Sequence, residues 1–150
     1  MNPRPGNVLL NFRKADRLSS ISVIDWEFVA IGPSFVDIGN FVAELFCTGY
    51  LNSVDSTYAE VLDSFMLAYR AFGGLLDVRR AIAFVGAGII ECLPRRMKNS
   101  SRGTTATARK CVDHALRFII NADSTDLASG ENDPFASLSR ILRDCQSAGE

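Results

Sequence analysis

Two short apolar runs near the start of the sequence predict a β-hairpin. Residues 8–12 form the first run, directly after a proline and a glycine that are typical of a turn, and residues 22–24 form the second. The polar residues 13–20 lie between the two runs and are expected to form a loop. Two short β-rich runs joined by a polar loop are the usual signature of a hairpin.

From Ser34 onward the apolar positions recur at the spacing of an α-helix. The first helix is expected to begin at Ser34, with this serine as N-cap and Asp37 three residues later as its capping-box-like partner. The second helix carries apolar residues from Tyr58 to Tyr69, and Gly73 and Gly74 are expected to end it.

The apolar residues also predict a third and a fourth helix. Residues 78–93 are apolar around most of the helix circumference, which predicts a central position, and Pro94 is expected to close this helix. Arg95 and Arg96 then lie near its carboxyl end, where the helix dipole favours cations. Residues 106–120 form the fourth predicted helix.

The organisation predicted from this pattern is one main domain with a short C-terminal extension. Residues 1–121 hold the hairpin and four helices, residues 122–132 form a polar linker, and residues 133–150 form a further helix and tail that open on Asp133 and Pro134. The expected fold class is therefore mainly α with a small β-hairpin.

Charge and hydropathy exclude two classes of partner. Sixteen basic and seventeen acidic residues in 150 give a net charge of −1, whereas nucleic-acid-binding domains carry a strongly basic face. The sequence contains neither a charged-then-apolar leader nor eighteen consecutive apolar residues, and its most apolar stretch, residues 81–93, contains Glu91. We therefore expect no nucleic acid, no membrane and a cytoplasmic location.

The four cysteines predict neither a disulfide framework nor a zinc site. Cys47, Cys92, Cys111 and Cys145 include no C-x-x-C pair, and the sole histidine, His114, has no partner at ligand spacing. Unpaired cysteines are commonly buried, so we expect free thiols in a reducing compartment.

Two polar residues flank the predicted hairpin and are candidates for chemistry. Asn7 stands just before the first strand and Asp25 just after the second, so the hairpin should bring them within a few ångströms of each other. A carboxylate and an amide oxygen suit Mg²⁺, which binds hard oxygen ligands and often shares them with phosphates. Asn and Asp at strand ends are also common turn formers, and spacing alone leaves both interpretations open.

The wider sequence resembles the metal-binding region of the aminoglycoside phosphotransferase and choline kinase-like family. The matching segments are VIDWEF at residues 23–28, GP at 32–33 and FVDIG at 35–39, and PGNVLL at 5–10 is similar to the end of that family's catalytic loop. The same arrangement also looks like methylthioribose kinase. The resemblance implies the C-terminal lobe of a protein-kinase-like fold, with the N-terminal, nucleotide-binding lobe missing.

The resemblance also implies a role for individual residues. Asn7 and Asp25 match the residues that hold Mg²⁺ against the phosphates of ATP. Asp37 matches a buried carboxylate that braces the catalytic loop. Glu27 is a candidate for a second metal or a substrate contact, or else a structural carboxylate, and Trp26 is expected to serve packing.

Several positions depart from the family pattern. Asn2 stands where the catalytic aspartate is expected, and an amide cannot accept a proton from the substrate hydroxyl as a carboxylate can. The sequence contains no G-x-G-x-x-G loop, and Gly86 and Gly88 lie within an apolar helix, where close helix packing explains them better. We therefore expect the chain to be inactive alone.

Three functional hypotheses follow. The first is a phosphotransferase that acts on a hydroxyl group of a small molecule. If this acceptor is cationic, acidic side chains are expected to face its pocket; the alternative for the same side chains is a solvated helix face. These candidates are Glu44, Asp55, Glu60 and Asp63. The second is a non-catalytic, pseudokinase-like interaction domain that forms oligomers through its exposed lobe interface. The third is a plain helical domain with accidental resemblance.

Overall fold

The computed structural model describes residues 5–13, 17–25, 31–52, 55–72, 74, 76–98, 100 and 103–122. A short 3-10 turn, η1 (Pro5–Asn7), leads into the antiparallel strands β1 (Val8–Arg13) and β2 (Arg17–Val23). Four helices follow: α1 (Ser34–Leu51), α2 (Asp55–Ala71), α3 (Val78–Met97) and α4 (Thr105–Ile120). The predicted class, mainly α with a small hairpin, is confirmed. The predicted C-terminal helix lies outside the described residues, as does the predicted linker apart from Ala122.

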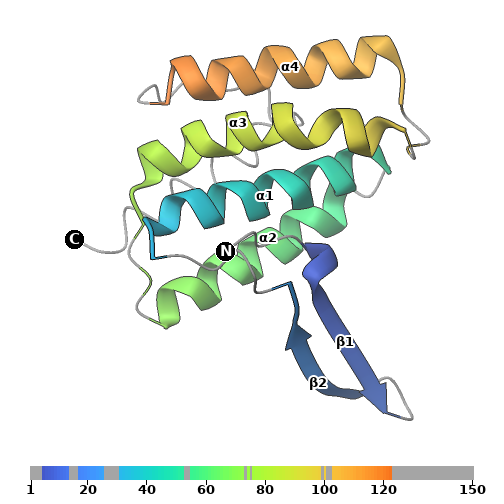
Figure 1. Ribbon diagram of the computed structural model, residues 1–150, viewed down its shortest axis with the longest axis vertical. Coiled ribbons are helices and arrows are strands. Elements are labelled where there is room, and N and C mark those ends of the chain that lie inside the picture. Colours follow the sequence, from blue (N-terminus) through green and yellow to red (C-terminus); the bar gives the residue numbers. More distant parts are fainter. Residues whose placement is uncertain are drawn as a thin grey trace.

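The four helices pack side by side in the spatial order α2, α1, α3, α4 (Figure 1). The most extensive contact joins α1 to α3, and α4 covers the other side of α3. The apolar third helix is therefore central, as predicted. The hairpin extends away from this helical layer, and its strands make their main contacts with each other.

Two glycines of α3 permit close approach of the neighbouring helices. A Cβ atom added to Gly88 would lie 2.7 Å from the Cβ of Ala43 on α1. A Cβ added to Gly86 would lie 2.5 Å from the carbonyl oxygen of Ala115 on α4. Both distances are shorter than van der Waals contact, so any side chain here would push the helices apart. Helix packing, the interpretation given to these two glycines from sequence, is borne out.

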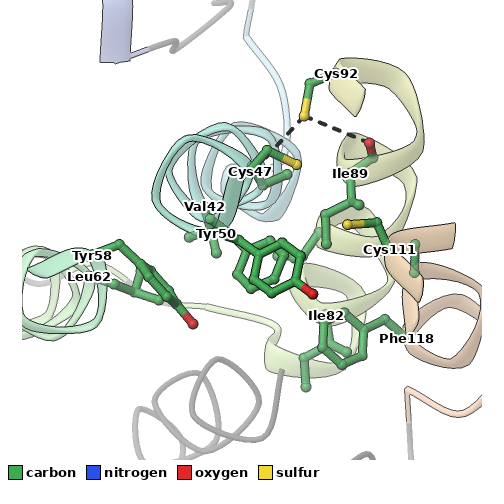
Figure 2. Packing of buried hydrophobic residues seen from close by; sticks show 14 of the residues in the cluster. Val42, Cys47, Tyr50, Tyr58, Leu62, Ile82, Ile89, Cys92, Cys111 and Phe118 are labelled. Atoms are coloured by element: carbon green, nitrogen blue, oxygen red, sulfur yellow. Dashed lines mark hydrogen bonds between the residues drawn. The ribbon is translucent and has the colours of Figure 1, made fainter. Parts of the chain in front are cut away.

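The buried core is centred on α1. Phe46 is fully buried; its ring stacks on Tyr50 with the centroids 5.5 Å apart and meets Tyr58 of α2 edge-on at 5.4 Å. Aromatic pairs in these two geometries are favourable beyond the area they bury. Figure 2 shows the core continuing from Tyr58 and Leu62 of α2 across α1 and α3 to Phe118 of α4.

The predicted N-cap of the first helix is wrong. Ser34 is the first residue of α1 and not its cap; the N-cap position is held by Pro33, whose side chain makes no capping hydrogen bond. The side chains of Asp77 and Thr104 do cap α3 and α4, accepting hydrogen bonds from the backbone N–H of Arg80 and Thr107. Proline has no side-chain acceptor for this role, which explains the difference.

The end of the third helix also differs from the prediction. Pro94 does not close α3, which continues to Met97. Proline removes one helical hydrogen bond but leaves the following residues free to stay helical when other contacts hold them. Arg95 and Arg96 supply those contacts, because both guanidinium groups bind Glu44 of α1 and fix the last turn of α3 against it.

The hairpin is longer than the sequence predicted. A β-bulge explains why part of its second strand was not recognised from the sequence pattern. Residues 17–20 belong to β2 and not to a polar loop. Asn11 pairs with Ser20 and Phe12 with Leu18, so Ser19 is an extra residue without a partner across the ladder. A bulge interrupts the alternation of faces along the strand, and the apolar residues of β2 therefore fail to recur at every second position.

Candidate functional site

The hairpin brings Asn7 and Asp25 together at its base. The side-chain Nδ2 of Asn7 donates a hydrogen bond to Oδ2 of Asp25 over 3.0 Å. The backbone reinforces this closure, since the N–H of Ile24 donates to the carbonyl oxygen of Asn7 over 2.9 Å. The two residues are eighteen positions apart in the chain, and their proximity is what the hairpin predicted.

Asp25 adopts an uncommon backbone conformation. Its φ of 68° lies in the left-handed region, and among the described residues it is the non-glycine residue with a positive φ. Aspartate tolerates this region better than most residues, and such conformations are enriched at functional sites. Strand β2 ends at Val23, and the carboxylate of Asp25, two residues further on, is solvent-exposed beside Asn7.

The oxygen atoms of Asn7 and Asp25 are ligands of the kind that a hard cation prefers. Asp25 offers a carboxylate, and the Asn7–Asp25 hydrogen bond uses the amide nitrogen of Asn7 and not its oxygen. Mg²⁺ commonly binds one or two protein oxygens and completes its shell with water and phosphate. The pair fits such a shared site. It does not form a self-sufficient metal cage, because no group of three or more His, Cys, Asp or Glu residues within the described part of the chain could hold a metal.

Of the remaining residues of the predicted site, the structure describes Asp37 alone. Asn2, Trp26 and Glu27 lie outside the described residues. Asp37 is half-buried in the first turn of α1, and this turn is well separated from η1 in Figure 1. Its predicted role as a brace for the catalytic loop therefore stays a prediction.

The side chain of Glu44 faces neither a substrate pocket nor solvent, contrary to the expectation from the sequence. Its side chain is only 6% exposed and accepts hydrogen bonds from Arg95 and from Nε and Nη2 of Arg96, the latter two at 2.9 and 2.6 Å. Burial raises the pKa of Glu44, but hydrogen bonds and positive charge from the two arginines outweigh burial and lower it below its usual range. Glu44 therefore serves to join α1 to α3.

The other acidic candidates are on α2. Glu60 and Asp63 are exposed on α2, and the side chain of Asp55 lies outside the described residues. These positions agree with the solvated helix face that was the alternative for them.

Three cysteines are buried free thiols, as predicted, and Cys145 lies outside the described residues. Cys92 of α3 donates from Sγ towards the carbonyl oxygen of Ala43, one helical turn before Cys47 on α1 (Figure 2). The neighbouring Cys92 thiol and burial both raise the pKa of Cys47 well above its usual range, and burial raises the pKa of Cys111 to about 11. Thiols in this state are poor nucleophiles.

One feature that the sequence did not indicate lies at the tip of the hairpin. Arg13 and Arg17 are paired across the ladder and, with Leu18 and Ser19, line an open groove. Arg13 is oriented by a hydrogen bond from its Nε to Oγ of Ser19 over 3.1 Å. The hairpin is therefore basic at its tip and carries a carboxylate at its base.

Comparison of the chain with protein families, curated proteins and solved structures gives no match. Within the described residues, no helix combines the length and apolar character needed to cross a membrane.

Proposed function

We propose that the chain is a C-terminal lobe of the aminoglycoside phosphotransferase and choline kinase-like family, in which Asn7 and Asp25 hold Mg²⁺ against the phosphates of ATP. The observation that carries the proposal is the 3.0 Å contact between these two side chains at the base of the hairpin. Residues that the sequence motif assigns to one metal site are neighbours, although eighteen positions separate them.

Each residue has a distinct part in this proposal. The exposed carboxylate of Asp25 supplies the negative charge that attracts the cation, and the backbone of this residue lies in the left-handed region. The amide of Asn7 orients the carboxylate through its nitrogen and offers its oxygen as a second ligand. When bound, Mg²⁺ would neutralise phosphate charge, which is the main electrostatic requirement of phosphoryl transfer.

We further propose that the 150 residues do not transfer phosphate by themselves. Phosphoryl transfer also needs a group that accepts the proton of the attacking hydroxyl, and Asn2 stands at the position of that group in the family. The chain also lacks a glycine-rich loop of the G-x-G-x-x-G type to cover the phosphates. In the complete reaction, the acceptor would be a small molecule with a hydroxyl group.

Metal titration of the full chain tests this proposal. Mn²⁺, used as a paramagnetic substitute for Mg²⁺, is added with and without ATP, and bound metal is followed by water proton relaxation. We expect weak binding that ATP strengthens and that excess Mg²⁺ reverses. Asp25→Asn keeps the side-chain shape and removes the charge, so it should abolish the signal.

Asp63→Asn is the matched control, because it removes an exposed carboxylate from α2 and leaves the hairpin unchanged. Equal loss of signal in the two variants, or no signal in the unaltered chain, contradicts the metal site. Phosphate transfer from ATP to an aminoglycoside or choline by the chain alone contradicts the interpretation of Asn2.

A second candidate function is a non-catalytic interaction domain of pseudokinase-like type. The exposed apolar residues of the hairpin favour it, because apolar surface of this kind commonly marks an interface. A chain that binds a partner through the hairpin but neither Mn²⁺ nor ATP would support this function over the first.

A further inference from the structure

The last pair of the hairpin ladder places two positive charges opposite each other. Arg13 of β1 pairs with Arg17 of β2, and residues in such a pair share one face of the ladder. Like charges in this arrangement are destabilising. Within the described part of the chain neither guanidinium group forms an ion pair. Residues 13–17 contain three basic residues and one acidic residue, so the tip of the hairpin carries a net charge of +2.

The β-bulge brings a hydroxyl group to this pair of arginines. Ser19, the extra residue of the ladder, accepts a hydrogen bond at Oγ from Nε of Arg13 over 3.1 Å. Bulges are common beside functional sites, where they re-aim a side chain. The hydrogen bond holds the guanidinium plane of Arg13 through Nε, so Nη1 and Nη2 can bind a ligand. The hydroxyl of Ser19 accepts here and can donate its own hydrogen to the same ligand.

The three polar side chains line an open groove. Arg13, Arg17, Leu18 and Ser19 form its lining, and all four are exposed to solvent. The tip of the hairpin points away from the helical layer in Figure 1, so the described helices do not cover the groove. A basic, solvent-accessible groove with a serine hydroxyl has the chemistry of an anion site.

We propose that this groove binds a phosphate monoester group. Arg13 and Arg17 contact it from two sides, and the hydroxyl of Ser19 donates a further hydrogen bond. A guanidinium group offers N–H donors in a fixed fork that matches two oxygens of a phosphate. A phosphate monoester has three acceptor oxygens and close to two negative charges at pH 7, which is the charge that two arginines neutralise. A carboxylate has one charge and two oxygens, so it matches only one of the two guanidinium groups.

The phosphate site is separate from the metal site at the base of the hairpin. Strand β1 has six residues, and a strand rises about 3.3 Å per residue, so roughly 20 Å separate the tip from Asn7 and Asp25. One phosphate group cannot contact both places. Asp25→Asn should therefore leave phosphate binding unchanged, and the two proposals fail separately.

Titration of the full chain, labelled with nitrogen-15, with inorganic phosphate tests the proposal. Proton–nitrogen correlation spectra follow the Nε–Hε signals of Arg13 and Arg17 in ~0.1 M NaCl, where charges more than ~10 Å apart are screened. We expect saturable shifts with a dissociation constant on the order of 1 mM, because the groove is open to water. Arg17→Gln should weaken binding ~10-fold or more, since it removes a charge-assisted contact. Arg109→Gln is the matched control, because it makes the same change at an exposed arginine of α4 and should stay within about threefold.

Two conservative variants separate a built site from general attraction of charge. Arg17→Lys keeps the charge and loses the fork, so it should weaken binding by about threefold to tenfold. Ser19→Ala keeps both charges and removes the hydroxyl, and it should weaken binding about threefold or more. The backbone amide signals of β1 and β2 in the same spectra check that each variant keeps the hairpin paired.

Two further ligands identify the source of the phosphate group. Phenyl phosphate represents a soluble phosphate ester, and phosphatidylcholine vesicles with phosphatidic acid represent a lipid headgroup. Binding of either one that Arg17→Gln weakens supports the site and names its source. The absence of saturable binding to all three probes overturns the proposal. Equal weakening by Arg17→Gln and Arg109→Gln, or Arg17→Lys binding as tightly as the unaltered chain, does so as well.

Discussion

The Glu44→Gln substitution should destabilise the fold measurably at neutral pH. The carboxylate is 6% exposed and accepts hydrogen bonds from two guanidinium groups, so the substitution removes a buried charge and replaces one acceptor oxygen by a donor. Breaking a buried ion pair costs ~3–5 kcal/mol. Arg95 and Arg96 are 46% and 30% exposed and can be hydrated by water, which lowers this cost. We therefore expect a loss of about 2–3 kcal/mol, equivalent to roughly 5–10 °C in Tm for a chain of this size.

The pH dependence gives a second readout of the same interaction. The pKa of Glu44 in the folded chain is lowered from its ordinary value of 4.5. Its contribution to the free energy of unfolding is therefore fully present above about pH 4.5 and is lost as the pH falls through the lowered pKa. The difference between the unaltered chain and Glu44→Gln should be constant from pH 6 to 7.5 and shrink as the solution is acidified, because a protonated Glu44 resembles glutamine.

Urea unfolding followed by circular dichroism at 222 nm, repeated from pH 7 to pH 3, measures both effects. Glu60→Gln is the control, because it changes an exposed carboxylate on α2 and should stay within ~0.5 kcal/mol of the unaltered chain. Two results would refute the reasoning: equal stability of the two glutamine variants at pH 7, or a penalty for Glu44→Gln that is unchanged at pH 3.

Further predictions concern helix packing and the cysteines. Gly86→Ala should lower the stability by about 1–3 kcal/mol, because its Cβ would lie 2.5 Å from the carbonyl oxygen of Ala115, whereas Gly6→Ala should leave Tm nearly unchanged because no atom lies within 4 Å of the added carbon. Thermal unfolding by circular dichroism compares the two, and equal Tm values would contradict the close α3–α4 contact. Cys47, Cys92 and Cys111 should resist iodoacetamide at pH 8 in the folded chain and react after addition of guanidinium chloride, as measured by mass spectrometry of digested peptides, because all three are buried and the pKa values of Cys47 and Cys111 are raised. Rapid labelling of any of them in the native chain would contradict their burial.

The helices could be predicted from sequence because their apolar spacing repeats over several turns. The apolar circumference of residues 78–93 correctly placed α3 in the centre, between α1 and α4. The helix ends were less predictable. Pro94 is a helix breaker by local preference, yet α3 continues because Arg95 and Arg96 bind Glu44, fifty-one and fifty-two residues away in sequence. A contact over that separation has no local signal.

The candidate site was predictable to the extent that it depends on the hairpin. Two apolar runs were enough to place Asn7 near Asp25, since the ends of paired strands must meet. The left-handed backbone of Asp25 was not predictable, because aspartate also occurs widely in ordinary conformations. The course of residues 17–20 was missed because the unpaired Ser19 separates Leu18 from Ile21 by three positions, which conceals the alternation typical of a strand.

The weak attachment of the hairpin to the helices has a thermodynamic consequence for whatever binds at its base. Asn7 and Asp25 are neighbours only while β1 and β2 are paired, and that pairing can open locally without unfolding the helical core. A ligand that needs both residues binds with an apparent affinity reduced by the fraction of molecules in which the hairpin is open. Any partner that covers the exposed apolar side chains of the hairpin raises the paired fraction and so tightens binding at the base, although it touches neither residue. Covering of the apolar side chains and binding at the base are thus coupled through the folding equilibrium of the hairpin. Amide hydrogen exchange of β1 and β2 would measure this equilibrium directly.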